Sequence, residues 1–113
     1  AYLYRAALKS PYYGQVQQIV RILAESGWTD WGGFAVQWAR KNSGGPAQWE
    51  MMSLLEQLPV PPEEKAEQLR ELDRLVQEKK LKVQRGYWPA SVAARYLEKW
   101  GQEALRRGEE QHG

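Results

Sequence analysis

The sequence predicts an all-α protein, a compact bundle of about five helices with room for a short helical turn at its N-terminus. Apolar residues recur at helical spacing in at least four segments and alternate at strand spacing in none. Proline and glycine divide these segments at the positions where helices usually begin and end. A chain of 113 residues that is 42% hydrophobic and 27% charged has the size and composition of one globular domain.

The N-terminal segment predicts two helices. Residues 2–9 form the first, short one. Ser10 and Pro11 then end it and begin the second, because serine is a favoured cap and proline suits the first helical position. The apolar face of the second helix consists of Tyr12, Val16, Ile19, Val20 and Leu23. Ser26-Gly27 closes it, since glycine accepts the left-handed conformation after a helix.

A third helix is expected to begin at Thr29 as its cap. It carries an aromatic face made of Trp31, Phe34 and Trp38. Gly32-Gly33 falls in its first turn, although each glycine costs about 1 kcal/mol relative to alanine there. Either a close approach of two helices or a backbone contact to a ligand or partner would account for these glycines. Residues 42–46 form the clearest loop.

The second half of the chain predicts two longer helices after a short one. Residues 47–58 carry the apolar stripe Met51, Leu54, Leu55 and Leu58. Prolines 59, 61 and 62 end that helix, and the last two begin the longest one, which we expect to run to Val83. Its apolar positions are Leu69, Leu72, Val76 and Val83, with Lys79 where another apolar residue would fall.

Residues 84–88 are expected to form a second loop, and Pro89 opens the last helix, which ends at Gly108. A small β-hairpin over residues 82–88 is the alternative. One domain should therefore span residues 1–108, followed by a frayed tail over 109–113. The buried core is expected to contain Val16, Ile19, Leu23, Phe34, Trp38, Leu55, Leu72, Val76, Leu97 and Trp100.

The composition excludes several kinds of chemistry. The chain has no cysteine, which excludes disulfides and thiolate chemistry and fits a cytoplasmic location. His112 is the only histidine and lies in the predicted tail, so histidine-dependent catalysis and zinc sites of the usual kind are not expected. The carboxylates between Glu63 and Asp73 are interpreted as a solvated helix face paired with neighbouring arginines. We expect no cofactor, no metal, no small-molecule substrate and no membrane contact.

Charge is distributed unevenly along the chain. Residues 74–107 contain nine basic and three acidic side chains, although the net charge of the whole chain is only +2. Within this basic block, Arg85-Gly86-Tyr87-Trp88 combines an arginine with two aromatic rings, as surfaces that stack on bases do. The predicted nucleic-acid contacts are Lys79, Lys80, Lys82, Arg85, Tyr87, Trp88, Arg95 and Lys99. The alternatives are a solubilising surface and a Tyr87-Trp88 pair that folds back onto the core.

These patterns favour a non-catalytic helical module that binds RNA or DNA within a larger assembly. Backbone charge and aromatic stacking would provide the affinity. The second hypothesis is a protein–protein adaptor or oligomerisation domain that uses the Trp31, Phe34 and Trp38 face or the long helix after Pro62. An enzyme ranks third, because a partner domain would have to supply most of its catalytic groups.

Overall fold

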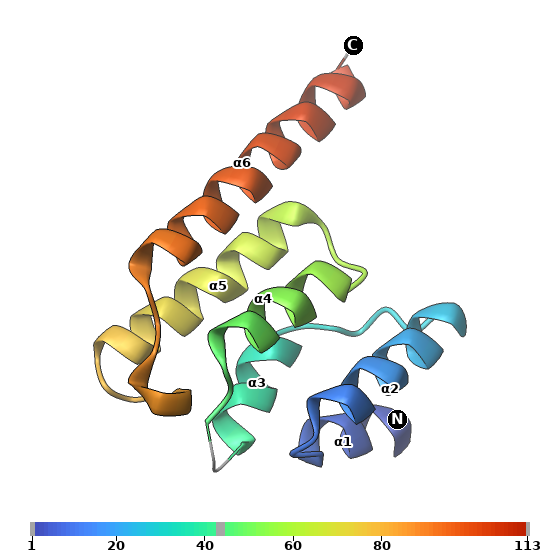
Figure 1. Cartoon of the computed structure of the whole chain (residues 1–113). Helices are drawn as coiled ribbons and strands as arrows, with labels where there is room; N and C mark the ends of the chain where they lie inside the picture. The colour runs from blue at the N-terminus through green and yellow to red at the C-terminus, as the bar shows by residue number, and fades with distance from the viewer. Residues whose placement is uncertain (1, 43–44, 113) are drawn as a thin grey trace.

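Figure 1 shows a computed structural model that describes residues 2–42 and 45–112, with side chains through residue 108. The elements, in chain order, are α1 (Tyr2–Lys9), α2 (Tyr13–Glu25), α3 (Phe34–Lys41), α4 (Gln48–Gln57), α5 (Pro62–Gln77), a 3₁₀ turn η1 (Gln84–Gly86) and α6 (Ala90–His112). Within those ranges there is no β-strand, so the all-α prediction is confirmed and the hairpin alternative is wrong. The described residues form six α-helices, whereas about five were predicted.

The helices pack around α3, which contacts α1, α4 and α5. The α1 and α2 helices pack against each other, and α2 also touches α4. The α5 and α6 helices lie side by side and form the most extensive helix pair (Figure 1). Trp31, Phe34 and Trp38 are almost fully buried at the centre. An adaptor that uses this aromatic face is therefore a wrong prediction, because the protein's own helices already cover the face.

The second helix begins slightly later than its cap signal suggests. Ser10 Oγ accepts a hydrogen bond from the Tyr12 backbone N–H at 3.2 Å, which holds a turn before the helix rather than its first residue. The α2 helix starts at Tyr13, and this ring enters the core while Tyr12 is exposed. The prediction that Tyr12 lies on the apolar face is therefore wrong by one residue.

The start of α3 is capped from a distant part of the chain. Thr29 is not its cap, because the helix begins at Phe34 after Gly33, whose φ is +65°. The N–H of Ala35 donates to Oε1 of the buried Gln68 on α5 at 3.1 Å. Gln68 thus satisfies one of the amides that the first turn of a helix leaves free. An added Cβ at Gly33 would meet only Gln37 Nε2, at an ordinary 3.6 Å, so lack of space does not require glycine here. The left-handed backbone does, because residues with a Cβ rarely adopt it.

The longest predicted helix ends six residues early. The α5 helix stops at Gln77, and Lys79 takes a left-handed conformation with φ +60°. The Lys80 N–H donates to the Leu75 carbonyl at 2.8 Å and the Lys79 N–H donates to the Val76 carbonyl at 3.1 Å. These two bonds define a Schellman motif, in which glycine usually occupies the position of Lys79. The prediction of helix to Val83 is therefore wrong.

The segment after α5 is extended and returns to the core. Leu81 and Val83 are both buried. The Gln84 N–H donates to the Pro46 carbonyl at 2.9 Å. Gly45 allows this approach, because a Cβ there would lie 2.7 Å from the Lys82 carbonyl oxygen. Of the predicted loop over residues 42–46, Ser43 and Gly44 lie outside the described residues.

The last helix begins after Pro89 as predicted but does not end at Gly108, since helical backbone continues to His112. The predicted tail over 109–113 is therefore helical through His112, and Gly113 lies outside the described residues. The predicted core residues are buried except Val76 and Leu97, which are partly buried against the core. Among the described residues, no helix is both long and apolar enough to cross a membrane.

Two adjacent residues of α2 test the assignment of its buried face. Leu23 is buried, whereas Ile22 is half exposed on the same helix. Leu23→Ala should lower the free energy of unfolding by about 2–5 kcal/mol, because it leaves a cavity in the core. Ile22→Ala should change it by less than about 1 kcal/mol. Urea unfolding followed by circular dichroism measures both, and equal losses would contradict the assigned face.

Candidate nucleic-acid interface

A groove of about 1050 Å³ lies between α4, the η1 turn and the start of α6. The α4 wall contributes Trp49, Ser53, Glu56 and Gln57. The remaining wall contributes Arg85, Tyr87, Arg95 and Tyr96. The groove therefore combines aromatic rings, arginines, neutral hydrogen-bonding groups and the carboxylate of Glu56, which pairs with Lys99. Its walls come from segments far apart in the sequence.

The turn that carries Arg85 is strained. Arg85 and Gly86 have φ values of +58° and +64°, and the Tyr87 N–H donates to the Gln84 carbonyl at 3.1 Å. Two consecutive left-handed residues, enclosed by a hydrogen bond between the residue after them and the residue before them, are typical of a type I′ turn, which favours Asn-Gly. An arginine in this conformation costs roughly 1 kcal/mol. The turn places Arg85 and the 65% exposed Tyr87 on the groove wall.

Trp88 lies inside the protein rather than on this surface. Its side chain is 8% exposed, and its Nε1–H donates to Asp73 Oδ1 on α5 at 3.0 Å. The indole thus has its hydrogen-bond partner within the protein and presents no free face. The predicted role of Trp88 in stacking on a base is therefore wrong, and the alternative in which it folds back onto the core holds for this ring.

The α6 helix brings Arg95, Tyr96 and Lys99 to one side. A smaller hollow of about 210 Å³ formed by these three residues adjoins the groove, since Arg95 and Tyr96 line both. Lys99 Nζ pairs with Glu56 on α4, and this hydrogen bond raises the pKa of Lys99 above its ordinary value. Within the described side chains, Arg85 and Arg95 form no ion pair.

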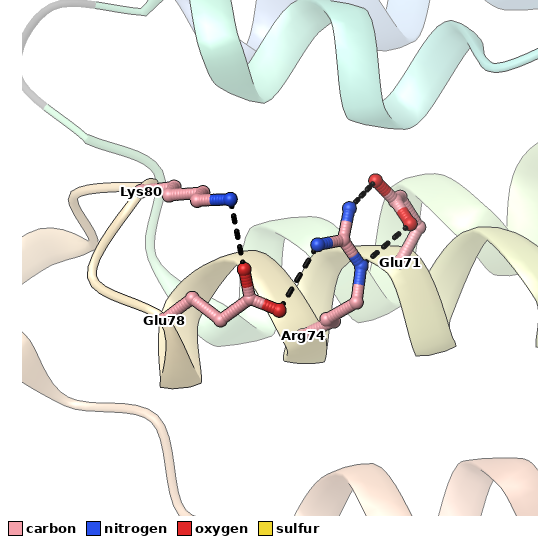
Figure 2. A network of polar contacts seen from close by, with 4 residues as sticks. All are labelled: Glu71, Arg74, Glu78 and Lys80. Carbon is pink, nitrogen blue, oxygen red and sulfur yellow. Dashed lines mark hydrogen bonds and ion pairs between the residues drawn. The ribbon is translucent and has the colours of Figure 1, made fainter.

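The remaining predicted lysines do not line the groove. Lys79, Lys80 and Lys82 are exposed around the end of α5. Figure 2 shows Lys80 in a network in which Glu78 bridges it to Arg74, while Arg74 also contacts Glu71. The bonds from Lys80 and Arg74 lower the pKa of Glu78, and those from Glu71 and Glu78 raise the pKa of Arg74. The charge of Lys80 is therefore already compensated.

The acidic side chains between Glu63 and Asp73 do not assemble a metal centre. Among the residues whose side chains are described, no group of three or more histidine, aspartate or glutamate residues could hold a metal ion. Instead Glu71 pairs with Arg74, Glu63 pairs with Arg107, and Asp73 accepts from Trp88. Of these, the Glu71–Arg74 pair is the contact with a neighbouring arginine that was predicted. The other two connect α5 to Arg107 on α6 and to the buried Trp88.

Trp49 and Tyr96 are aromatic groove residues that were not among the predicted contacts, and Trp49 is the more exposed of the two. It falls outside the apolar stripe of its helix and is 65% exposed. Its ring packs edge-on against Tyr13, with centroids 5.4 Å apart and planes at 78°. The available signal was a tryptophan off the apolar face of an amphipathic helix, where large apolar side chains are uncommon.

Comparison of the chain with protein-family models, with curated proteins and with solved structures finds no match. Functional inference therefore depends on the groove and its charges.

Lys79 offers a test of the Schellman ending of α5. Lys79→Gly should raise the free energy of unfolding by roughly 0.5–1 kcal/mol, because glycine relieves the left-handed strain. Glu67→Gly, at an exposed position inside the same helix, should lower it by about 1 kcal/mol. Chemical denaturation compares the two variants. A loss of stability in Lys79→Gly would contradict the assigned helix end.

Proposed function

We propose that the chain is a non-catalytic helical module that binds nucleic acid within a larger assembly, and that the groove between α4, η1 and α6 is its binding surface. The observation that carries the proposal is the pair Arg85 and Arg95, which line this groove without an ion-pair partner among the described side chains. A phosphate backbone supplies the negative charge that such arginines bind, often through two parallel hydrogen bonds.

The strain at Arg85 supports the same proposal. Asparagine or glycine would suit this turn better than arginine. Lys79, the other non-glycine residue with positive φ among the described residues, ends α5, whereas Arg85 lies in a turn on the groove wall, where backbone strain is a basis for inferring a functional contact. Tyr87 follows directly in the chain and offers an exposed ring beside this charge, as in surfaces where bases stack next to phosphate contacts.

Without the buried Trp88, the other seven predicted contacts divide into two groups under this proposal. Arg85, Tyr87 and Arg95 lie in the groove itself, with Lys99 in the adjoining hollow. A phosphate at Lys99 must compete with Glu56. Lys79 and Lys82 would add longer-range attraction, because exposed charges act over about 10 Å at moderate salt, whereas Lys80 is paired with Glu78.

The second candidate function is a protein–protein adaptor. One observation favours it: α1, α2 and the turn between them expose the large side chains Tyr2, Tyr12 and Ile22. Exposed aromatic residues are enriched in protein interfaces. None of the residues on this surface lines the groove or belongs to the predicted basic contacts. Substitutions can therefore test the two functions separately.

Removing the two unpaired arginines tests the charge contacts. Arg85→Gln with Arg95→Gln should weaken binding of a labelled single-stranded oligonucleotide, because two phosphate contacts are lost. The slope of log affinity against log salt should flatten by about 0.7 per lost contact. Fluorescence anisotropy at several salt concentrations measures both quantities for RNA and DNA.

The matched control for that experiment replaces Arg5 and Arg21 with glutamine. Both are exposed on α1 and α2, and neither lines the groove. The control has the same net charge as the groove variant. Equal weakening in the two variants would indicate diffuse attraction and contradict a binding groove. No saturable binding by the wild type below about 100 μM at low salt would contradict nucleic-acid binding itself.

A single substitution at Arg85 separates folding from binding. Arg85→Asn should raise the free energy of unfolding by roughly 0.5–1 kcal/mol, since asparagine tolerates the left-handed conformation. The same change should weaken oligonucleotide binding. Thermal unfolding and anisotropy give the two values, and a variant that gains stability without losing affinity would contradict a functional reason for the strain.

A further inference from the structure

Trp49 differs from the other tryptophans of the chain. Four of the six are buried, namely Trp31, Trp38, Trp88 and Trp100, and Trp28 is partly buried against the core. Only the Trp49 indole is 65% exposed, and it forms part of the groove wall on α4. An indole on a groove wall can offer a large flat face to a ligand while part of the ring remains packed.

The exposed ring is held in place from the core. Tyr13 packs against Trp49 and also lies 6.2 Å from the Trp38 ring. The Tyr13 hydroxyl accepts hydrogen bonds from the Gln17 and Gln57 amides at 3.1 and 3.3 Å. Trp38 is in turn fixed, because its Nε1–H donates to the Ser10 carbonyl at 2.8 Å. This chain of contacts orients Trp49 before any ligand arrives, which lowers the entropy lost on binding.

The rest of the groove defines the ligand that this ring would meet. The neutral side chains Ser53 and Gln57 and the Glu56 carboxylate, which is paired with Lys99, line the groove from α4 together with Trp49. Tyr87 and Arg85 line it from the η1 turn and the residue that follows. Flat faces, hydrogen-bonding edges and negative charge occur together in a nucleotide. In a duplex, however, base faces are stacked on their neighbours, so only an unpaired base can offer one to a protein ring.

We infer that the groove selects unpaired nucleic acid, with one base stacked on Trp49 and another on Tyr87, while Arg85 and Arg95 bind the phosphates. This inference rests on the proposed function and names its substrate class as a single strand. Trp49 takes the stacking role that the sequence suggested for Trp88. Base-face stacking tolerates any base, so the preference is for unpaired strand rather than for a sequence.

The experiment compares four proteins with three labelled ligands. The proteins are the wild type, Trp49→Ala, Trp49→Phe and Tyr12→Ala, the last an exposed aromatic residue that does not line the groove. The ligands are an oligo-dT strand, an oligo-U strand and a DNA duplex of the same length. Thermal unfolding of each variant verifies that it is folded.

Trp49→Ala should bind both single strands about 5- to 100-fold more weakly with an unchanged salt slope, because it removes stacking and no charge. Trp49→Phe should recover most of the affinity, and Tyr12→Ala should match the wild type. The duplex should bind the wild type at least about tenfold more weakly than either strand. The single strand should also quench tryptophan fluorescence of the wild type more than that of Trp49→Phe.

Four results would overturn the inference, and they differ in which parts of the proposed function they leave intact. Equal affinity of wild type and Trp49→Ala, or equal binding of duplex and single strand, would remove the stacking role and leave charge-based binding intact. Unlabelled poly-glutamate and unlabelled single strand can each be added as competitors of the labelled oligonucleotide. If both displace it at the same concentration, the groove binds acidic chains in general. Absence of saturable binding to all three ligands would contradict the proposed function as well.

Discussion

The groove depends on the point at which α5 ends. If the helix continued to Val83, as its apolar spacing suggests, Leu81 and Val83 would point to nearly opposite sides of it, because residues two positions apart in a helix do so. Both side chains are in fact buried in the core. The left-handed backbone at Lys79 instead turns the chain and sends an extended segment back along the loop before α4. The bond from the Gln84 N–H to the Pro46 carbonyl and the close approach at Gly45 anchor this segment. Its continuation carries Arg85 and Tyr87 to one side of the groove, with Trp49 on the α4 wall.

The path of the chain also separates basic residues that have an ion-pair partner from basic residues that have none. At the end of α5, Arg74 pairs with Glu71 and shares Glu78 with Lys80, so these side chains satisfy one another at the surface. Exposed pairs of this kind add little stability and little attraction for an anion. Arg85 and Arg95 have no such partner among the described side chains and lie beside exposed rings. The distribution of charge in space therefore differs from the simple count of basic residues along the chain.

Most of the helical architecture was predictable from spacing and from proline and glycine positions, because burial of one helix face imposes a local period on the sequence. The predicted helix boundaries were wrong where contacts between residues far apart in the sequence determine where a helix begins or ends. Gln68 caps α3 from 33 positions away, so the cap at Thr29 was not needed. Lys79 occupies a glycine-like position, which leaves no signal for the end of α5. At the candidate site, Arg85, Tyr87 and Arg95 were predicted and lie in the groove. Trp88 and Trp49 were misjudged, because exposure of an aromatic ring depends on tertiary packing.

The indole N–H signals of the six tryptophans give the most direct test of the groove as a binding surface. In a two-dimensional ¹H–¹⁵N spectrum of the labelled protein, each tryptophan contributes one such signal, so the bound ring can be identified. Titration with a single-stranded oligonucleotide should shift the Trp49 signal together with the backbone amides of Arg85 and Tyr87. The Trp88 signal should stay in place, since that N–H donates to Asp73. Shifts confined to α1 and α2, or a Trp88 signal that moves while Trp49 does not, would contradict the assignment of this groove.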